Sequence, residues 1–273
     1  MKKLLLSGLW KIVLFILYSL ILAPVVVVLG VSFTATEWPE FPPEELSLRW
    51  YRSLGKLLPM APQMRYVWDA TRTSVTIALM VVILTIAVGI LVAYVMVRYR
   101  FPGKGLVDAV VNFPVVMPSL VSGIALLLIF SRLRLFSVLV RLMIGHVIVV
   151  LPWAVRTMIT SLAGFKISLE EAAMTLGASR IAAFRHITLP MLTPGIIGAS
   201  IFAFIGSFMN FTVSFFLYTG DVKPFPMWMY EYMRWTFDPG LAAVSALFIV
   251  PTLIAVIAMQ RFVGLAAMFG YGE

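Results

Sequence analysis

The feature that most constrains this chain is a series of long runs without a charged residue. A helix needs about 20 mostly apolar residues to cross a lipid bilayer, and five uncharged runs reach that length. They occupy residues 12–36, 73–97, 109–131, 187–220 and 239–260. Hydrophobic residues fill 62% of the 273 positions and charged residues only 12%, about half the share usual in soluble proteins. The chain is therefore predicted to be an all-α polytopic membrane protein.

A sixth membrane span is predicted around an interrupted apolar run. The run 142–155 is too short by itself, because Arg141 and Arg156 bound it. It becomes a span of about 138–161 if one arginine extends its side chain toward an interface. The prediction is thus six transmembrane helices.

The apolar run that follows His186 is too long for a single helix. Pro190 and Pro194 favour a helix start near Thr193, because proline is tolerated only in the first turn. The fifth span is therefore predicted at about 193–219.

Charged residues near the spans predict the orientation of the chain. Lys2, Lys3 and Lys11 put the N-terminus in the cytoplasm by the positive-inside rule. Six spans then return the C-terminus to the cytoplasm as well. A group of arginines disagrees, because this topology places it outside. The group is Arg132, Arg134 and Arg141.

The regions outside the main bundle have distinct compositions. The first span, 1–36, is interpreted as a retained helix and not a signal peptide, because its apolar stretch exceeds the usual length of about 7–15 residues. The segment 37–72 is rich in proline and glutamate, and it is predicted to be a periplasmic loop that ends in a short interfacial helix. Residues 263–273 are predicted to form a cytoplasmic tail.

Composition excludes several classes of function. The net charge of +9 is spread over residues beside apolar spans, so no nucleic-acid partner is predicted, and membrane lipids are the expected neighbours. Cysteine is absent and only two histidines occur, so no metal site is predicted. No glycine-rich phosphate loop with Lys-Ser/Thr is present, so no bound cofactor and no catalytic residue are expected in this chain.

One polar segment, "SLEEAAMTLGASRIAAFRHITLP" at 168–190, separates two apolar runs. Ser168 precedes Glu171 by three residues, which is the spacing of a capping box and predicts a short helix that starts there. Gly177 suits the end of that helix, where a left-handed backbone is required. Ser179 is placed to cap a second short helix. The segment therefore predicts helix, turn and helix outside the lipid.

This segment resembles the EAA motif of ABC-importer permeases, in which E-A-A is followed by three residues, G, nine residues and I-x-L-P. The matching residues are Glu171, Ala172, Ala173, Gly177, Ile187, Leu189 and Pro190. The resemblance covers about 73–262 and implies the type I ABC importer permease fold. It also implies that 162–190 is a coupling loop, whose short helix docks on a cytoplasmic ATP-binding subunit. Glu170, just before the motif, is either a further contact or a residue that interacts with the helix dipole.

The resemblance further implies partners and a location. Two ATP-binding subunits would hold the ATP, and a periplasmic solute-binding protein would deliver the solute. A second, homologous permease would complete the pathway as a heterodimer, with a homodimer as the alternative. The expected location is the bacterial inner membrane, with both termini in the cytoplasm.

The solute is predicted from a finer resemblance. The stretches "LSLRWYRSL" and "GASRIAAFRHITLP" resemble the spermidine/putrescine-type branch, and the chain resembles the second permease of such an operon. The same branch resembles permeases for iron(III) and aminoethylphosphonate, which stay as alternatives. An alternative of another class is a stand-alone secondary transporter or channel, which needs no docking helix and usually shows internal repeats.

Several polar and aromatic residues are candidates for the solute pathway. Helical spacing places three phenylalanines of the fifth span near one face, where they either line a pathway or pack against helices. The histidine and arginine of the fourth span either face a water-filled cavity or bond a neighbouring helix. These candidates are Phe204, Phe208, Asn210, Phe211, His146 and Arg156. In the third span, Asn112, Pro114 and Pro118 predict a kink.

Overall fold

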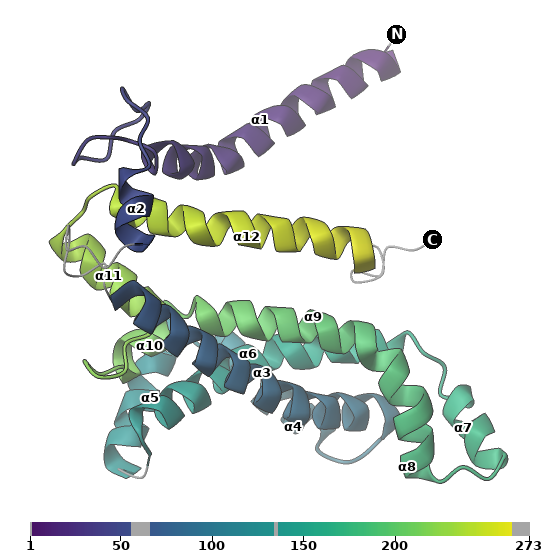
Figure 1. The fold of residues 1–273 in the computed structure, drawn as a ribbon. Coiled ribbons are helices and arrows are strands. Elements are labelled where there is room, and N and C mark those ends of the chain that lie inside the picture. The colour runs from purple at the N-terminus through teal and green to yellow at the C-terminus, as the bar shows by residue number, and fades with distance from the viewer. Residues whose placement is uncertain (1, 56–65, 134–135, 264–273) are drawn as a thin grey trace. The chain divides into compact units, whose positions relative to one another are not determined.

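The computed structural model describes residues 2–55, 66–133 and 136–263. Every named element in these ranges is a helix (Figure 1). Contacts divide the chain into two compact units, which are described separately. Unit 1 combines Met1–Tyr66 with Met229–Ala258, and unit 2 combines Val67–Trp228 with Met259–Glu273.

Within the described residues, four helices are long and apolar enough to cross a membrane, and a bent pair raises the number to five. The four are in α1 (Lys2–Val31), α3 (Val67–Arg98), α6 (Val138–Ala163) and the continuous run Arg180–Phe208. The helix α12 (Gly240–Val263) is apolar over a shorter stretch, Gly240–Ile254. The predicted six spans are compatible with this set.

In unit 1, the chain that leaves α1 folds back on itself. The amide of Ser47 donates to the carbonyl of Phe33 at 2.6 Å, and the hydroxyl of Tyr51 donates to Oγ of Ser32 at 2.7 Å. These contacts position the short helix α2 (Arg49–Gly55), which the sequence predicts. Trp50 of this helix is buried.

Unit 1 also contains the turn before α12. The helix α11 (Phe225–Trp235) is followed by Asp238, whose carboxylate accepts hydrogen bonds from the Tyr232 hydroxyl at 2.7 and 2.8 Å. The same carboxylate accepts from the amide of Gly240 at 2.9 Å, where α12 begins. Burial raises the pKa of Tyr232, and the hydrogen bond to Asp238 raises it further. The tyrosine therefore stays a neutral donor that fixes the turn.

Unit 2 is built on three long helices, α3, α6 and α9 (Leu189–Phe208), which pack against one another (Figure 1). Small residues allow the helices to approach closely, as the glycines and alanines of α9 predict. A Cβ on Gly195 would lie 2.5 Å from Cβ of Ser161 in α6. A Cβ on Gly89 in α3 would lie 3.0 Å from Cε of Met158.

The third predicted span, 109–131, is wrong as a single helix. The structure has α4 (Lys104–Val116) and α5 (Ser119–Leu133), bent by 106° at the break between them. Met117 takes an extended conformation, with φ −75° and ψ 137°, which the ring of Pro118 favours because it disfavours a helical backbone in the residue before it. The predicted kink is thus present, and it divides the span into two helices.

The fifth predicted span, 193–219, is wrong at both ends. Helical structure starts at Arg180 and continues through a π-helical turn, η2 (Phe184–Thr188), into α9. In this wider turn the Leu189 amide donates to the Phe184 carbonyl, five residues back. The next residue, Pro190, lacks an amide hydrogen and lies in the first turn of α9, so the helix continues through it.

Beyond α9 the backbone starts a new helix, α10 (Phe211–Leu217). The side-chain oxygen of Asn210 accepts from the amide of Val213 at 2.9 Å and so caps α10. The chain therefore leaves the helix after Phe208, which sequence periodicity did not predict.

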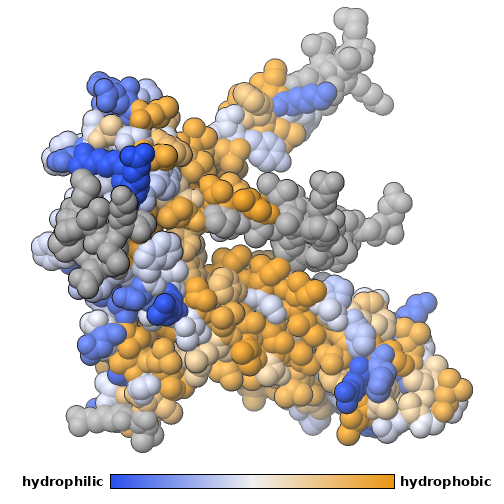
Figure 2. Space-filling view, viewed as in Figure 1, coloured by the Kyte–Doolittle hydropathy of each residue, from blue (hydrophilic) through white to orange (hydrophobic). Residues whose placement is uncertain are grey.

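The surface of unit 2 matches a position in the bilayer. Figure 2 shows an apolar band over α3 and α9, with polar residues gathered at the end that carries α7 (Ser168–Thr175) and α8 (Arg180–Ala183). Many of the apolar side chains in the band are exposed, for example Ile83 and Leu91 of α3. Lipid can cover such a surface, whereas water would not favour it.

Candidate coupling surface

The polar end of unit 2 carries a compact helix–turn–helix segment. The helix α7 ends in a Schellman motif, in which the amide of Ala178 donates to the Ala173 carbonyl and the amide of Gly177 to the Met174 carbonyl. Gly177 has φ of +95°, a conformation that favours glycine. The sequence places glycine here because the chain must turn sharply before α8.

The predicted caps of the two helices have different outcomes. Ser179 caps α8, since its hydroxyl accepts from the amide of Ala182 at 3.2 Å. Ser168 does not cap α7, so the predicted capping box is wrong. The helix begins one residue earlier, where Ile167 is already helical and its carbonyl accepts from the amide of Glu171 at 3.1 Å. That amide is the one that the Ser168 hydroxyl was expected to bind.

The outer face of this segment carries exposed apolar side chains. Leu176 is 89% exposed and Ile181 is 79% exposed, on either side of the Gly177 turn. Glu171 and Ala172 are exposed beside them, and Ala173 is half-buried. The segment 171–181 is named here the coupling surface. Exposed apolar residues outside the lipid band, next to an acidic residue, are typical of a protein contact.

Glu170, the residue before Glu171 in α7, faces the bundle. Its side chain is buried, and Nη2 of Arg98 lies 2.8 Å from its Oε1. The hydroxyl of Tyr94 donates to its other oxygen, Oε2, at 3.3 Å. The structure thus places Glu170 in an intramolecular ion pair, whereas the adjacent Glu171 is exposed.

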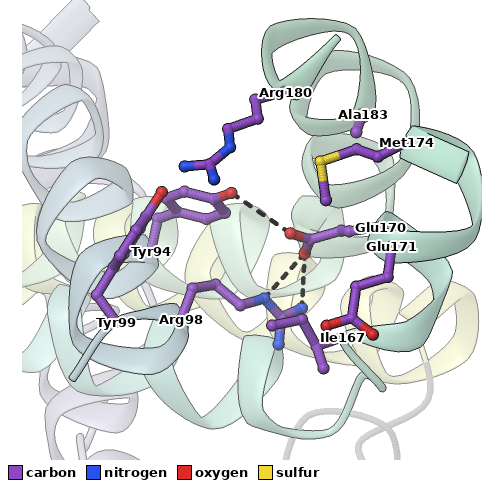
Figure 3. Close-up of a pocket in the computed structure, with 9 residues that line it drawn as sticks. All are labelled: Tyr94, Arg98, Tyr99, Ile167, Glu170, Glu171, Met174, Arg180 and Ala183. Carbon is purple, nitrogen blue, oxygen red and sulfur yellow. Dashed lines mark hydrogen bonds and ion pairs between the residues drawn. The ribbon is translucent and has the colours of Figure 1, made fainter. Parts of the chain in front are cut away.

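A pocket of about 200 Å³ lies between the end of α3 and the segment α7–α8 (Figure 3). Figure 3 shows Glu170 pointing toward Arg98 and Tyr94. The lining residues are Tyr94, Arg98, Tyr99, Ile167, Glu170, Glu171, Met174, Arg180 and Ala183. Polar groups of both signs therefore gather where the coupling segment meets the bundle.

The last residues of the EAA-like motif, the I-x-L-P part, lie outside the coupling surface. Ile187 is in η2, and Leu189 and Pro190 are the first two residues of α9. Ile187 and Leu189 are half-buried, while Pro190 is exposed. These residues join the coupling segment to a long helix of the bundle.

The candidate pathway residues do not form one stripe. Phe204 and Phe208 stack with ring centroids 5.9 Å apart, and Phe208 stacks on Phe225 at 5.6 Å. Phe211 lies beyond the end of α9 and stacks on Phe215 of α10 at 5.6 Å. The predicted shared face of the three phenylalanines is therefore wrong, because the helix ends at Phe208.

His146 and Arg156 bond to neighbouring helices. The ring nitrogens of His146, which is buried, lie 2.9 Å from Oγ of Ser207 and 3.1 Å from Oγ of Ser214. Arg156 forms an ion pair with Asp108 of α4, with Nη2 2.9 Å from Oδ1. His146 thus links α6 to α9 and α10, whereas the half-exposed Arg156 links α6 to α4.

Two residues of the site were missed by reasoning from the sequence. Tyr94 lies within the apolar run 73–97, and Arg98 is the charge that ends it. Their contacts with Glu170 cross 72 and 76 residues of sequence, so no local spacing reveals them. The available signal was weak: Tyr94 and Arg98 are one helical turn apart on the same face of α3.

Three similar proteins match between 46% and 89% of the chain. It is 26% identical over 244 residues to the spermidine/putrescine transport system permease protein PotC of Escherichia coli (strain K12), covering 89% of each. It is 31% identical over 208 residues to the molybdenum transport system permease protein ModB of the same strain, covering 70% of this chain and 90% of ModB. It is 34% identical over 139 residues to the probable sulfate transport system permease protein cysT of Marchantia polymorpha, covering 46% and 48%.

The fold matches a solved transporter. A bacterial ABC transporter involved in the import of the acidic polysaccharide alginate has a chain with a TM-score of 0.74, 14% sequence identity and coverage of 96% of this chain and 97% of that chain. Residues 85–265 match the family described as "Binding-protein-dependent transport system inner membrane component". The chain therefore belongs to the family of inner membrane components of binding-protein-dependent transport systems.

Proposed function

We propose that this ABC importer permease carries a polyamine across the inner membrane and is driven by a separate ATPase through its coupling surface. The observation that carries the proposal is the arrangement of the segment 168–183. It presents Leu176 and Ile181 at the end of unit 2, beyond the apolar band, and fixes them with a glycine turn and a capped helix. An apolar contact with an acidic neighbour, Glu171, suits a groove that carries basic residues.

The proposed assembly follows from the family. Two cytoplasmic ATP-binding subunits would dock on the coupling surfaces of two permeases, and a periplasmic protein would deliver the solute. We propose that the second permease is a related chain, and that both termini of this chain lie in the cytoplasm. This orientation puts the coupling surface in the compartment that contains ATP.

Among the possible solutes, a polyamine is favoured because the match to PotC extends over more of this chain than the matches to ModB and cysT do. The PotC match covers 89% of both chains, whereas the sulfate-permease match covers 46% of this one. The ModB match is more identical but covers 70% of this chain, so an oxyanion is the principal competing solute. Iron(III) and aminoethylphosphonate stay as further candidates.

The pathway itself is proposed near α10 and the α4–α6 contact. Phe211 and Phe215 are exposed and stacked, and aromatic faces attract ammonium groups. The Arg156–Asp108 pair is also partly exposed, and charged groups on membrane helices avoid lipid. His146 is proposed to be structural, because both ring nitrogens already have partners in the bundle.

The experiment that tests the function is transport by purified importer in liposomes. The chain, its ATP-binding subunits, its second permease and its binding protein would be assayed with labelled spermidine, putrescine, molybdate, sulfate, iron(III) and aminoethylphosphonate. We expect ATP-dependent uptake of the two polyamines. Uptake of molybdate or sulfate alone would contradict the proposal that the solute is a polyamine. Uptake without ATP would contradict the ATP-driven mechanism.

Variants of the coupling surface provide the control for that assay. Glu171→Lys reverses the charge of the proposed contact without changing a buried residue. We expect it to insert in the membrane like wild type and to lose most ATP-dependent uptake. Wild-type uptake by this variant would count against the coupling surface.

A further inference from the structure

Helix α7 is attached to the bundle through a charged side chain. Glu170 is the only buried residue among the eight of α7, all of which the structure describes, and it is 6% exposed. The larger apolar side chains of the helix, Leu169 and Met174, are exposed. A helix that buries so little apolar surface gains little from packing. Its position relative to α3 therefore depends on what Glu170 binds.

The carboxylate of Glu170 is held at both oxygens by α3. Arg98, the last residue of α3, approaches Oε1 with Nε at 2.9 Å and Nη2 at 2.8 Å. Tyr94, one turn earlier, donates to Oε2 at 3.3 Å. The remaining nitrogen of Arg98, Nη1, donates to the Phe165 carbonyl at 3.3 Å, in the link between α6 and α7. Figure 3 shows the three side chains converging from α3 and α7.

The same cluster reaches the next element of the coupling segment. The ring of Tyr94 meets Phe184 of η2 edge to face, with centroids 5.1 Å apart. Along its length, α3 packs against α6 and α9. A displacement of α7 thus has two routes into the bundle: the covalent route through α8 and η2 into α9, and a direct route from Glu170 into α3.

Because Arg98 and Glu170 are buried, the ion pair that forms the direct route resists separation. The side chains of Arg98 and Glu170 are both 8% exposed. Pulling them apart would leave two buried charges unpaired, which is strongly unfavourable, and the arginine contacts restrict the direction of approach. The neighbouring Glu171 is exposed and forms no ion pair within the described residues.

We propose that the Glu170–Arg98 pair is a tie that transmits displacement of α7 to α3. Glu170 is then a positioning residue of the transport cycle and not a contact of the ATP-binding subunit. The two adjacent acids have separate roles: Glu171 faces the partner, and Glu170 faces α3. This inference rests on the proposed function, because it assumes that an ATP-binding subunit moves α7.

The first test needs no solute and no partner. Hydrogen exchange on the full chain in lipid nanodiscs would compare wild type with Glu170→Gln and with the matched neighbour Glu171→Gln. We expect Glu170→Gln to speed amide exchange in 168–176 by about tenfold or more and to leave α9 unchanged, because the tie no longer holds α7. Glu171→Gln should leave that exchange within about twofold of wild type. Unchanged exchange in Glu170→Gln would overturn the tie.

The second test asks whether the tie carries motion. In liposomes, the importer would be assayed for solute taken up per ATP hydrolysed, with whichever of labelled spermidine, putrescine, molybdate or sulfate the wild type imports. We expect Glu170→Gln to keep its ATP-binding subunits on purification and to lose about tenfold or more of the uptake per ATP, because α7 then moves without α3. Glu171→Gln should instead release the ATP-binding subunits.

The opposite pattern would overturn the proposal. If Glu170→Gln released the ATP-binding subunits, or kept wild-type uptake per ATP, Glu170 would not be an internal tie. If Glu170→Gln fails to insert, Arg98→Lys replaces it, with changes in the same direction but smaller, because lysine keeps the charge but offers one nitrogen in place of three. A wild-type chain that binds no ATP-binding subunit would contradict the proposed function, and hydrogen exchange would still decide whether the tie exists.

Discussion

Gly177 makes a backbone turn that few residues could replace. Its φ of +95° costs a residue with a Cβ roughly 1–2 kcal/mol, and nothing lies within 4 Å of where that Cβ would be. We expect Gly177→Val to disturb the end of α7 and to weaken binding of the ATP-binding subunits. Gly177→Asn should have a smaller effect, because asparagine tolerates this backbone. Co-purification of the ATP-binding subunits measures the effect of each variant. Equal binding by wild type and Gly177→Val would mean that the Gly177 turn is not needed for this contact.

His146 bonds neighbouring helices, which is one of the two roles that the sequence leaves open for it. Its contacts with Ser207 and Ser214 hold α6 against the break between α9 and α10. We expect His146→Ala to lower the free energy of unfolding by about 1–3 kcal/mol, because two buried hydroxyls lose their partner. Thermal unfolding in detergent measures the loss, with Ile197→Ala on the exposed side of α9 as the control. If the His146→Ala chain were as stable as wild type but no longer imported solute, His146 would be a residue of the solute pathway and not a structural one.

At the scale of helices, the bundle depends on close approach between α6 and α9. A Cβ on Gly195 would lie 2.5 Å from Cβ of Ser161, which can move only together with the backbone that carries it. We expect Gly195→Ala to destabilise the fold by about 1–3 kcal/mol through overpacking. The matched control is Gly105→Ala in α4, where nothing lies within 4 Å of the new carbon. That change should be neutral or stabilising by up to about 1 kcal/mol.

Thermal unfolding of the two alanine variants gives the comparison. We expect the midpoint of thermal unfolding of Gly195→Ala to fall below that of Gly105→Ala. Equal midpoints would mean that α6 and α9 do not pack as closely as the structure places them.

The elements show where sequence reasoning succeeds. Hydropathy places the apolar part of α3 and the extent of α6, because lipid imposes the same requirement on each residue of a span. The Pro118 break and the Gly177 turn follow from restrictions on single residues. The ends of the fifth span were missed because the π-helical turn η2 lets the helix continue into Pro190, and such a turn has no clear local pattern.

The site was predictable to the extent that its chemistry is local. Gly177 and Ser179 follow from spacing within one segment. The tie between Glu170 and Arg98 does not, since 72 residues separate the partners and either residue alone resembles an ordinary charge near a membrane. Only the packing of α3 beside the coupling segment brings them together.

For the whole molecule, the absence of cysteine allows a direct test of orientation. Leu176→Cys would place a thiol on the coupling surface, and Trp38→Cys would place one in the first long loop, where the tryptophan is 75% exposed. With both termini in the cytoplasm, a membrane-impermeant maleimide added to intact cells lacking an outer membrane should label Trp38→Cys alone. In inverted membrane vesicles, the maleimide should label Leu176→Cys alone. Labelling of Leu176→Cys from outside would show that the topology is inverted.

The most direct test of the central claim is crosslinking from Leu176 in the assembled importer. A photoreactive group attached to Leu176→Cys, the most exposed large apolar residue of the coupling surface, should capture the ATP-binding subunit. We expect this product in native membranes, and we expect its formation to block ATP-dependent uptake. Crosslinks to lipid or to the periplasmic protein alone, with uptake unaffected, would contradict the claim that an ATPase moves this permease through α7.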